Sequence, residues 1–110
     1  MKEVRPLAKV EIFSGICGFS IMVEARMEDR HCTLSIKSEC ENIKNLSAEL
    51  TVVNPFREIS YRGEGPLTLK LAAKHCHHPA CPVPAGIIKA VEVAAGLALP
   101  ADATIKVSTS

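Results

Sequence analysis

The chain has 110 residues, of which 47% are hydrophobic, and this is enough for one domain with its own core but not for two. Thirteen basic and twelve acidic side chains leave a formal charge of +1, which excludes the basic field that attracts nucleic acid. Aromatic residues make up only 4% of the chain, so platforms for base stacking are excluded as well. Cysteine and histidine are abundant instead, with five and four copies.

The N-terminal segment 1–6 has no continuous apolar stretch, and no apolar run in the chain reaches the ~20 residues that a membrane span needs. We therefore expect an uncleaved cytoplasmic protein with no membrane partner. An odd number of cysteines in such a protein indicates reduced thiols, and Cys and His side chains that lie close together then indicate metal binding or catalysis. Each cysteine taken alone is more often a small buried apolar residue, and this interpretation stays open.

Alternating apolar and polar residues predict strands in the first third of the chain. Odd positions are apolar over residues 19–27 and even positions over residues 32–36, and the polar break at 28–30 predicts a hairpin between the two strands. An earlier stretch of strand at residues 10–12 has the opposite parity. Gly15 and Gly18, on either side of Cys17, are where a bulge can absorb that change.

Helix signals follow the hairpin. Ser38 and Glu41 fit a capping box, which predicts a helix with Ser38 as N-cap and Cys40 at its second residue. Asn54 precedes a proline and predicts a second, short helix, and residues 67–74 predict one or two further turns.

The last third of the chain predicts a stiff loop, a buried helix and a strand. Three prolines in six residues exclude regular structure in the segment 75–84 and predict the stiff loop there. Pro84 lies near the first turn of the helix that follows, which contains residues 85–95 and ends at Gly96. Alternation over residues 104–108 predicts a closing strand.

We expect one α+β domain over residues 1–110. Its sheet is small and mostly antiparallel, built from the N-terminal hairpin plus the C-terminal strand, and the helices pack on one face.

The hairpin brings two cysteines together. Apolar faces meet only if odd residues of the first strand oppose even residues of the second, and two short-loop registers satisfy this. A two-residue turn places Cys17 opposite Cys40, whereas a four-residue loop places Phe19 opposite Cys40 and leaves Cys17 on the diagonal. Directly opposed residues lie about 5 Å apart and diagonal ones about 7–8 Å. Cys32 lies at the other end in both registers and is expected to be a buried or neutral thiol.

Two further cysteines lie near the start of the last helix. Cys81 precedes that helix much as Cys40 lies at the start of the earlier one, and helix N-termini stabilise thiolates, the form of cysteine that binds metal. Cys76 comes five residues earlier on the same stiff loop. The pair alone is weak evidence for metal, but it gains weight beside Cys17 and Cys40.

Three of the four histidines lie on this loop, and each of them is either solvated or involved in metal binding. We expect at least one of His75, His77 and His78 to be a ligand or a hydrogen-bond partner of a ligand if metal binds. His78 is the first choice, because the restriction imposed by Pro79 fixes its direction. His31 lies in the hairpin turn and is expected to be solvated.

This layout resembles the iron–sulfur scaffold family of IscU and the N-terminal domain of NifU, over roughly residues 15 to 95. The resemblance rests on Cys17 followed by glycine before a hairpin, on Cys40 at a helix start, and on Cys81 before the run Ala-Gly-Ile-Ile-Lys-Ala at 85–90. It implies an IscU-like fold and cysteine ligands for a cluster. The chain also looks similar to an uncharacterised family of small cysteine-containing proteins from anaerobic bacteria and archaea.

Two positions depart from the scaffold pattern. Phe19 stands where that family has an acidic residue, so release of a cluster to client proteins is not implied. The third cysteine role falls either to Cys76, which follows His75, or to Cys81, which precedes the helix.

The leading hypothesis is a metal-site protein, a possible cluster scaffold or carrier, that binds zinc or an iron–sulfur cluster and meets protein partners in sulfur or cluster transfer. Its proposed metal ligands are Cys17, Cys40, Cys76 and Cys81, with His78 or His75 as an alternate or supporting group.

Two alternatives stay open. Cys81-Pro82-Val83-Pro84 resembles the Cys-Pro-x-Pro motif of the TusA sulfur-carrier family, which implies a persulfide on Cys81. The cysteines could instead be core residues of an uncharacterised domain. We assign no catalytic residues, because no Asp or Asn is evidently placed to orient a histidine beside a cysteine nucleophile.

Overall fold

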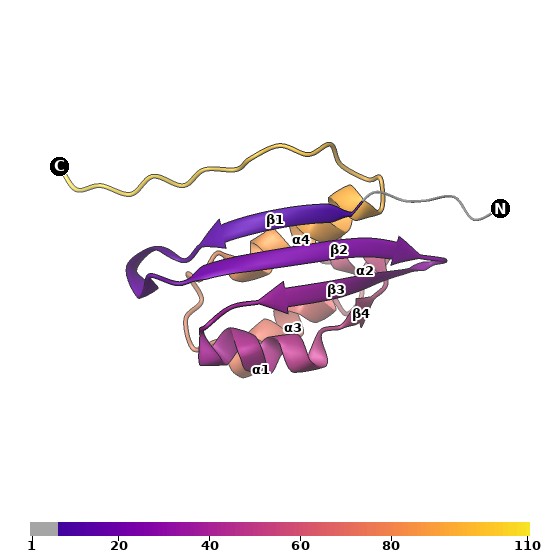
Figure 1. The fold of residues 1–110 in the computed structure, drawn as a ribbon, viewed down its shortest axis with the longest axis horizontal. Coiled ribbons are helices and arrows are strands. Elements are labelled where there is room, and N and C mark those ends of the chain that lie inside the picture. The colour runs from indigo at the N-terminus through magenta and orange to yellow at the C-terminus, as the bar shows by residue number, and fades with distance from the viewer. Residues whose placement is uncertain (1–6) are drawn as a thin grey trace.

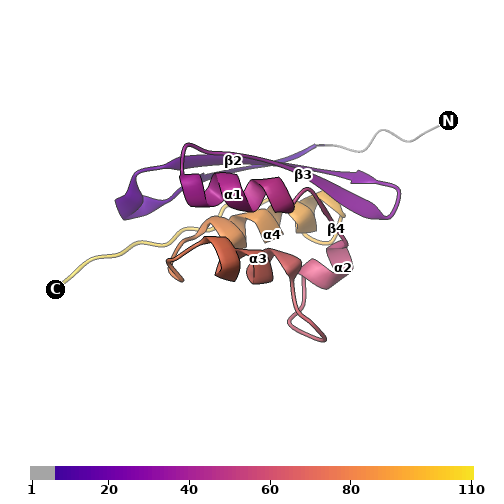
Figure 2. The same cartoon turned by 90° about the horizontal axis from the view of Figure 1, so that it is seen from below.

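The computed structural model describes residues 7–110. The expectation about the N-terminal segment 1–6 therefore falls outside the described residues. The chain forms an antiparallel sheet of four strands in the order β1-β2-β3-β4. The helices lie on one face of this sheet (Figure 1 and Figure 2). The predicted α+β class with helices on one face is therefore confirmed.

The elements in chain order are β1 (Ala8–Phe13), the 3₁₀ turn η1 (Gly15–Cys17), β2 (Ser20–Glu28), β3 (His31–Lys37), α1 (Glu41–Glu49), β4 (Val52–Val53), α2 (Pro55–Glu58), α3 (Leu67–His75) and α4 (Val83–Ala94). Within the described residues, none of these helices combines the length and the apolar character that crossing a bilayer requires.

The hairpin of β2 and β3 adopts one of the two registers that its apolar pattern allows. Met27 pairs with Cys32, which is the register that places Cys17 on the diagonal from Cys40. Pairing continues one step further, to Glu28 and His31, so the turn is shorter than the predicted four-residue loop. This turn includes Asp29 at a φ of 56°, a left-handed conformation that Asp tolerates better than most residues.

The parity change between the first two strands occurs around Cys17, as predicted, but through the turn η1 between two antiparallel strands and not through a bulge. β1 pairs with β2 so that Val10 opposes Val23 and Ile12 opposes Ile21, which keeps the apolar residues of both strands on one face. The chain reverses through η1 and Gly18, whose φ of 76° suits glycine. The break in the pattern therefore marks a loop that ends in a cysteine.

The predicted start of α1 is wrong by two residues. The helix begins at Glu41, and its N-cap is Cys40 in an extended conformation, with Ser38 outside the helix. The Ser38 hydroxyl accepts a hydrogen bond from the Cys40 backbone N–H at 3.1 Å, a local turn that competes with capping. The Cys40 carbonyl accepts the first helical bond, from Lys44 at 2.9 Å.

The predicted closing strand at 104–108 is also wrong. Residues 101–110 have no regular structure and are exposed, and Ile105 and Val107 are 81% and 89% exposed. Alternation shows which side chains would share a face, but a strand also needs a neighbour to hydrogen-bond with. The fourth strand of the sheet is instead β4, whose two residues are too short to give a pattern.

Helix α4 packs across β1 and β2 and is buried around most of its circumference, as predicted. Val83, Ile87 and Val91 are fully buried. Gly86 permits the close approach, because a Cβ at this position would lie 2.7 Å from Ile12 Cγ1 and closer still to Cδ1. This contact fixes the first turn of α4 against the sheet, and with it the loop that precedes the helix.

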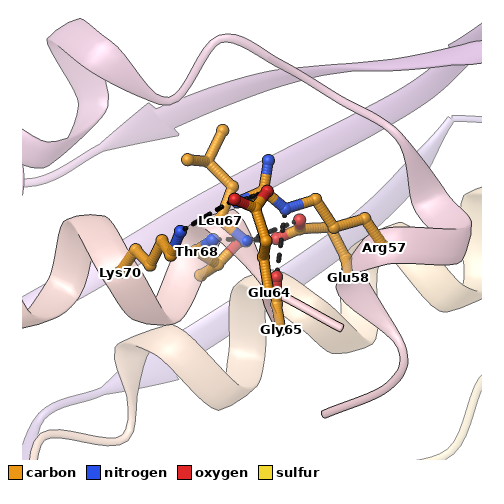
Figure 3. A network of polar contacts seen from close by, with 7 residues as sticks. All are labelled: Arg57, Glu58, Glu64, Gly65, Leu67, Thr68 and Lys70. Atoms are coloured by element: carbon orange, nitrogen blue, oxygen red, sulfur yellow. Dashed lines mark hydrogen bonds and ion pairs between the residues drawn. The ribbon is translucent and has the colours of Figure 1, made fainter. Parts of the chain in front are cut away.

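A buried carboxylate fixes the start of α3 (Figure 3). Glu58 is 1% exposed, and it accepts hydrogen bonds from the backbone N–H groups of Leu67 at 2.8 Å and Thr68 at 2.9 Å, and from the Thr68 hydroxyl. Nearby, Arg57 Nε donates to the Gly65 carbonyl at 3.0 Å. Burial of an unpaired carboxylate is costly, so these charge-assisted bonds are what makes the position tolerable. They anchor the helix that leads to Cys76.

Gly86→Val should lower the free energy of unfolding by about 1–3 kcal/mol, the usual cost of overpacking, because the added side chain collides with Ile12. Chemical denaturation measures this change. Ala85→Val is the matched control, since it introduces the same side chain at an exposed position of the same helix. It should cost about 0.7 kcal/mol or less, from helix propensity alone. Equal losses would mean that α4 does not depend on close contact at Gly86.

Candidate functional site

Four of the five cysteines border one cavity at one end of the sheet. The turn η1, the start of α1 and the loop between α3 and α4 come together at that end (Figure 1 and Figure 2). The cavity has a volume of ≈ 190 Å³. Its lining residues are Ser14, Cys17, Phe19, Ile21, Cys40, Asn42, Ile43, Cys76, His77, His78, Cys81 and Val83. The four cysteines proposed as metal ligands and His78 are in this set, whereas His75, the other histidine proposed as an alternate group, is not.

Cys17 is the exposed thiol of the four. It is the last residue of η1, and the Gly18 N–H donates to the Gly15 carbonyl at 2.9 Å to close that turn. The base of the loop is held by Ser14, whose hydroxyl accepts from the Phe19 N–H at 2.9 Å, while the Ser14 N–H donates to the Phe19 carbonyl. A closed loop therefore carries this thiol at the rim of the cavity.

Cys40 reaches the cavity from the start of α1 and is half-buried. As N-cap it lies beside the unpaired N–H groups of the first turn, at the positive end of the helix dipole. The position follows from the hairpin, because β3 ends at Lys37 and only three residues separate it from the helix.

Cys76 and Cys81 border the cavity from the ends of one short loop, and both are half-buried. Cys76 is the C-cap of α3, and its N–H donates to the Ala72 carbonyl at 2.7 Å. Cys81 closes a turn in which its N–H donates to the His78 carbonyl at 3.1 Å. Backbone hydrogen bonds thus hold the main chain of both residues in place at the cavity.

The thiols influence one another electrostatically. Burial raises the pKa of the Cys76 thiol above its ordinary value, and negative charge on Cys81 and Cys40 raises it further. Cys40 and Cys81 therefore lie close enough to Cys76 for negative charge on them to oppose its ionisation. A cation in the cavity would reverse that balance and favour the deprotonated forms.

The histidines of the loop divide into two groups. His77 and His78 line the cavity. His75 instead contacts the Glu49 carboxylate, which also lies 3.0 Å from Lys74 Nζ. Hydrogen bonds from both side chains lower the pKa of Glu49, and the bond from His75 has a larger effect than the bond from Lys74. His75 therefore fastens the end of α3 to α1, and the predicted site histidine, His78, is one of the two at the cavity.

Cys32 is a core residue, as predicted. It is 0% exposed within β3 and lies opposite Met27. Burial raises its pKa to about 11, against the lowering effect of a hydrogen bond with the Arg26 backbone. This thiol stays protonated and away from the cavity. His31, in the same hairpin, is exposed.

The sequence did not reveal the apolar wall of the cavity. Ile21, Ile43 and Val83 are buried residues of β2, α1 and α4 that face it beside the partly buried Phe19. Alternation assigned Phe19 and Ile21 to the core face, but only the packing of α1 and α4 shows that their side chains meet here. An apolar surround limits water and shapes the chemistry of any metal bound to thiolates.

In the part of the chain that the structure describes, no group of three or more His, Cys, Asp or Glu side chains is arranged so that it could hold a metal ion. The four thiols share a cavity but do not converge on one point. Coordination of an ion would therefore require their side chains to turn inward.

Residues 8–107 match the family described as "Family of unknown function (DUF6951)". The chain belongs to this family. No curated protein and no solved structure matches it. The family description assigns no activity, and the resemblance to iron–sulfur scaffolds stays a prediction.

The raised pKa of Cys76 predicts slow alkylation of this thiol in the metal-free protein, with a midpoint at higher pH than for a free cysteine. Cys81→Ser removes a neighbouring negative charge, so the midpoint should move to lower pH, while burial keeps it above that of an exposed thiol. Iodoacetamide labelling with peptide mass spectrometry measures both. Cys32→Ala is the control and should leave the midpoint in place. An unchanged midpoint in Cys81→Ser would mean that the two thiols are not neighbours.

Proposed function

We propose that this protein binds a metal centre, zinc or an iron–sulfur cluster, in the cavity bordered by Cys17, Cys40, Cys76 and Cys81. The observation that carries the proposal is that thiols from η1, α1 and the two ends of the α3–α4 loop border one cavity. Four thiolates match the ligand set of tetrahedral zinc and that of a [2Fe–2S] or [4Fe–4S] cluster.

The surroundings of the cavity support this function. Negative charge on Cys81 and Cys40 opposes ionisation of Cys76, and a bound cation would offset that effect. His78 and His77 are within the lining and supply nitrogen as an alternate ligand or as a hydrogen-bond donor to sulfur.

Location and partners follow from the same chemistry. Free thiols persist in a reducing compartment, so we place the protein in the cytoplasm. A protein partner in sulfur or cluster transfer would meet the cavity at Cys17, because this is the exposed thiol of the four.

Anaerobic purification, followed by zinc, iron and sulfide analysis and an absorption spectrum, tests the proposal. The wild-type protein should hold one centre per chain, and Ser at Cys17, Cys40, Cys76 or Cys81 should weaken its retention by more than about tenfold. Cys32→Ala is the matched control, since it removes a thiol outside the cavity and should retain the centre. Substoichiometric zinc and iron in the wild type, or equal losses in Cys40→Ser and Cys32→Ala, would contradict the proposal.

A second candidate function is sulfur transfer through Cys81. It is favoured by the position of Cys81 directly before α4, in a cavity that holds three other thiols as acceptors. A thiolate that attacks the outer sulfur of a Cys81 persulfide breaks the S–S bond and releases the Cys81 thiolate. Incubation of metal-free protein with a low-molecular-weight persulfide, followed by peptide mass spectrometry, separates the two functions. An added sulfur atom on Cys81, in a protein that retains no metal, would favour sulfur transfer over metal binding.

A further inference from the structure

The C-terminal tail, residues 101–110, has the alternating pattern of a strand but pairs with no strand of residues 7–110. Ile105 and Val107 alternate with polar residues, and both are more than four-fifths exposed, at 81% and 89%. Alternation of this kind is typical of a segment with one face against apolar side chains and the other in water.

The sheet has an open edge of matching character. Among the described residues, β1 has a strand neighbour only on its β2 side, so the backbone N–H and C=O groups of its other edge point outward. Of the apolar residues on its core face, Val10 and Ile12 are only partly buried. This edge is six residues long, whereas the opposite edge of the sheet is the two-residue β4.

The tail extends past the η1 end of its own domain. After α4 it runs alongside the domain, and the C-terminus lies beyond the η1 end in both views (Figure 1 and Figure 2). The molecule is correspondingly elongated, with extents of 55 × 29 × 27 Å. The family match spans residues 8–107, so β1 and the apolar pair of the tail belong to the same matched unit.

We propose that the tail of each copy adds as a strand to β1 of a second copy, which gives a two-fold dimer held by reciprocal strand exchange. The tail runs in the same direction as β1 of its own copy (Figure 1). A two-fold axis perpendicular to the tail reverses that direction. The partner copy therefore offers the antiparallel arrangement, which is the more stable pairing.

The side chains fix the register of this pairing. With Lys106 opposite Glu11, Ile105 and Val107 fall beside Ile12 and Val10 on the core face. Lys106 and Glu11 then form an opposite-charge pair on the outer face. A slip of one residue would turn both apolar tail residues to solvent.

Analytical ultracentrifugation of the full chain over a range of concentrations tests the proposal. The wild-type protein should be a dimer, and Ile105→Asp/Val107→Asp should raise its dissociation constant at least about tenfold, since two apolar side chains lose their buried partners. Thr104→Asp/Ser108→Asp is the matched control, because it adds the same charge on the outer face of the tail. Lys106→Glu should weaken the dimer, and Glu11→Lys should restore it in the same chain.

Hydrogen exchange tests whether a strand pairs with the open edge of β1. The β1 amides that face outward should be protected in the dimer and should lose protection in Ile105→Asp/Val107→Asp, which changes only exposed residues and leaves the core intact. A wild-type monomer at all concentrations, with or without protection of these amides by its own tail, would overturn the proposal. So would a dimer that both tail variants leave unchanged.

Discussion

The close contact between α4 and the face of β1 and β2 decides where the cysteine-bearing segments meet. Gly86 lets the helix approach Ile12 so closely that no side chain fits between them. The helix begins at Val83, which is fully buried, so its first turn is held at the η1 end of the sheet. The loop before that turn therefore places Cys76 and Cys81 at the end of the sheet where η1 places Cys17.

Electrostatics then separates the fifth cysteine from the other four. Cys32 is buried in β3 without a charged thiol beside it, and burial alone holds its pKa near the top of the thiol range, at about 11. Cys76 is less buried, but the charges of Cys81 and Cys40 act on it as well. The first thiol is neutral core material. A nearby positive charge would favour the thiolate form of Cys76, and this is the physical basis of the proposed metal centre in the cavity.

Apolar alternation, prolines and glycines in the sequence were enough to narrow the hairpin to two registers, one of which the structure adopts. They were also enough to predict the buried last helix and the grouping of four cysteines at one end. These features depend on local alternation and on proline and glycine, which leave clear patterns. The start of α1 was missed because the Ser38 hydroxyl bonds to the Cys40 N–H instead of capping the helix. Glu58 was missed because its partners are backbone N–H groups nine and ten residues away, which leave no sequence signal. A strand was predicted at 104–108 and did not form, because alternation does not show which strand a segment would pair with.

X-ray absorption at the K edge of the metal that co-purifies with the protein tests the assignment of the cavity most directly, because it reports the atoms bound to the metal. The account predicts a first shell dominated by sulfur at about 2.3 Å, the distance typical of thiolate ligands of zinc and close to that in clusters. Three or four sulfur neighbours would match the cavity cysteines, with His78 as the nitrogen ligand in the former case. A shell of only nitrogen and oxygen atoms near 2.0–2.2 Å would contradict it.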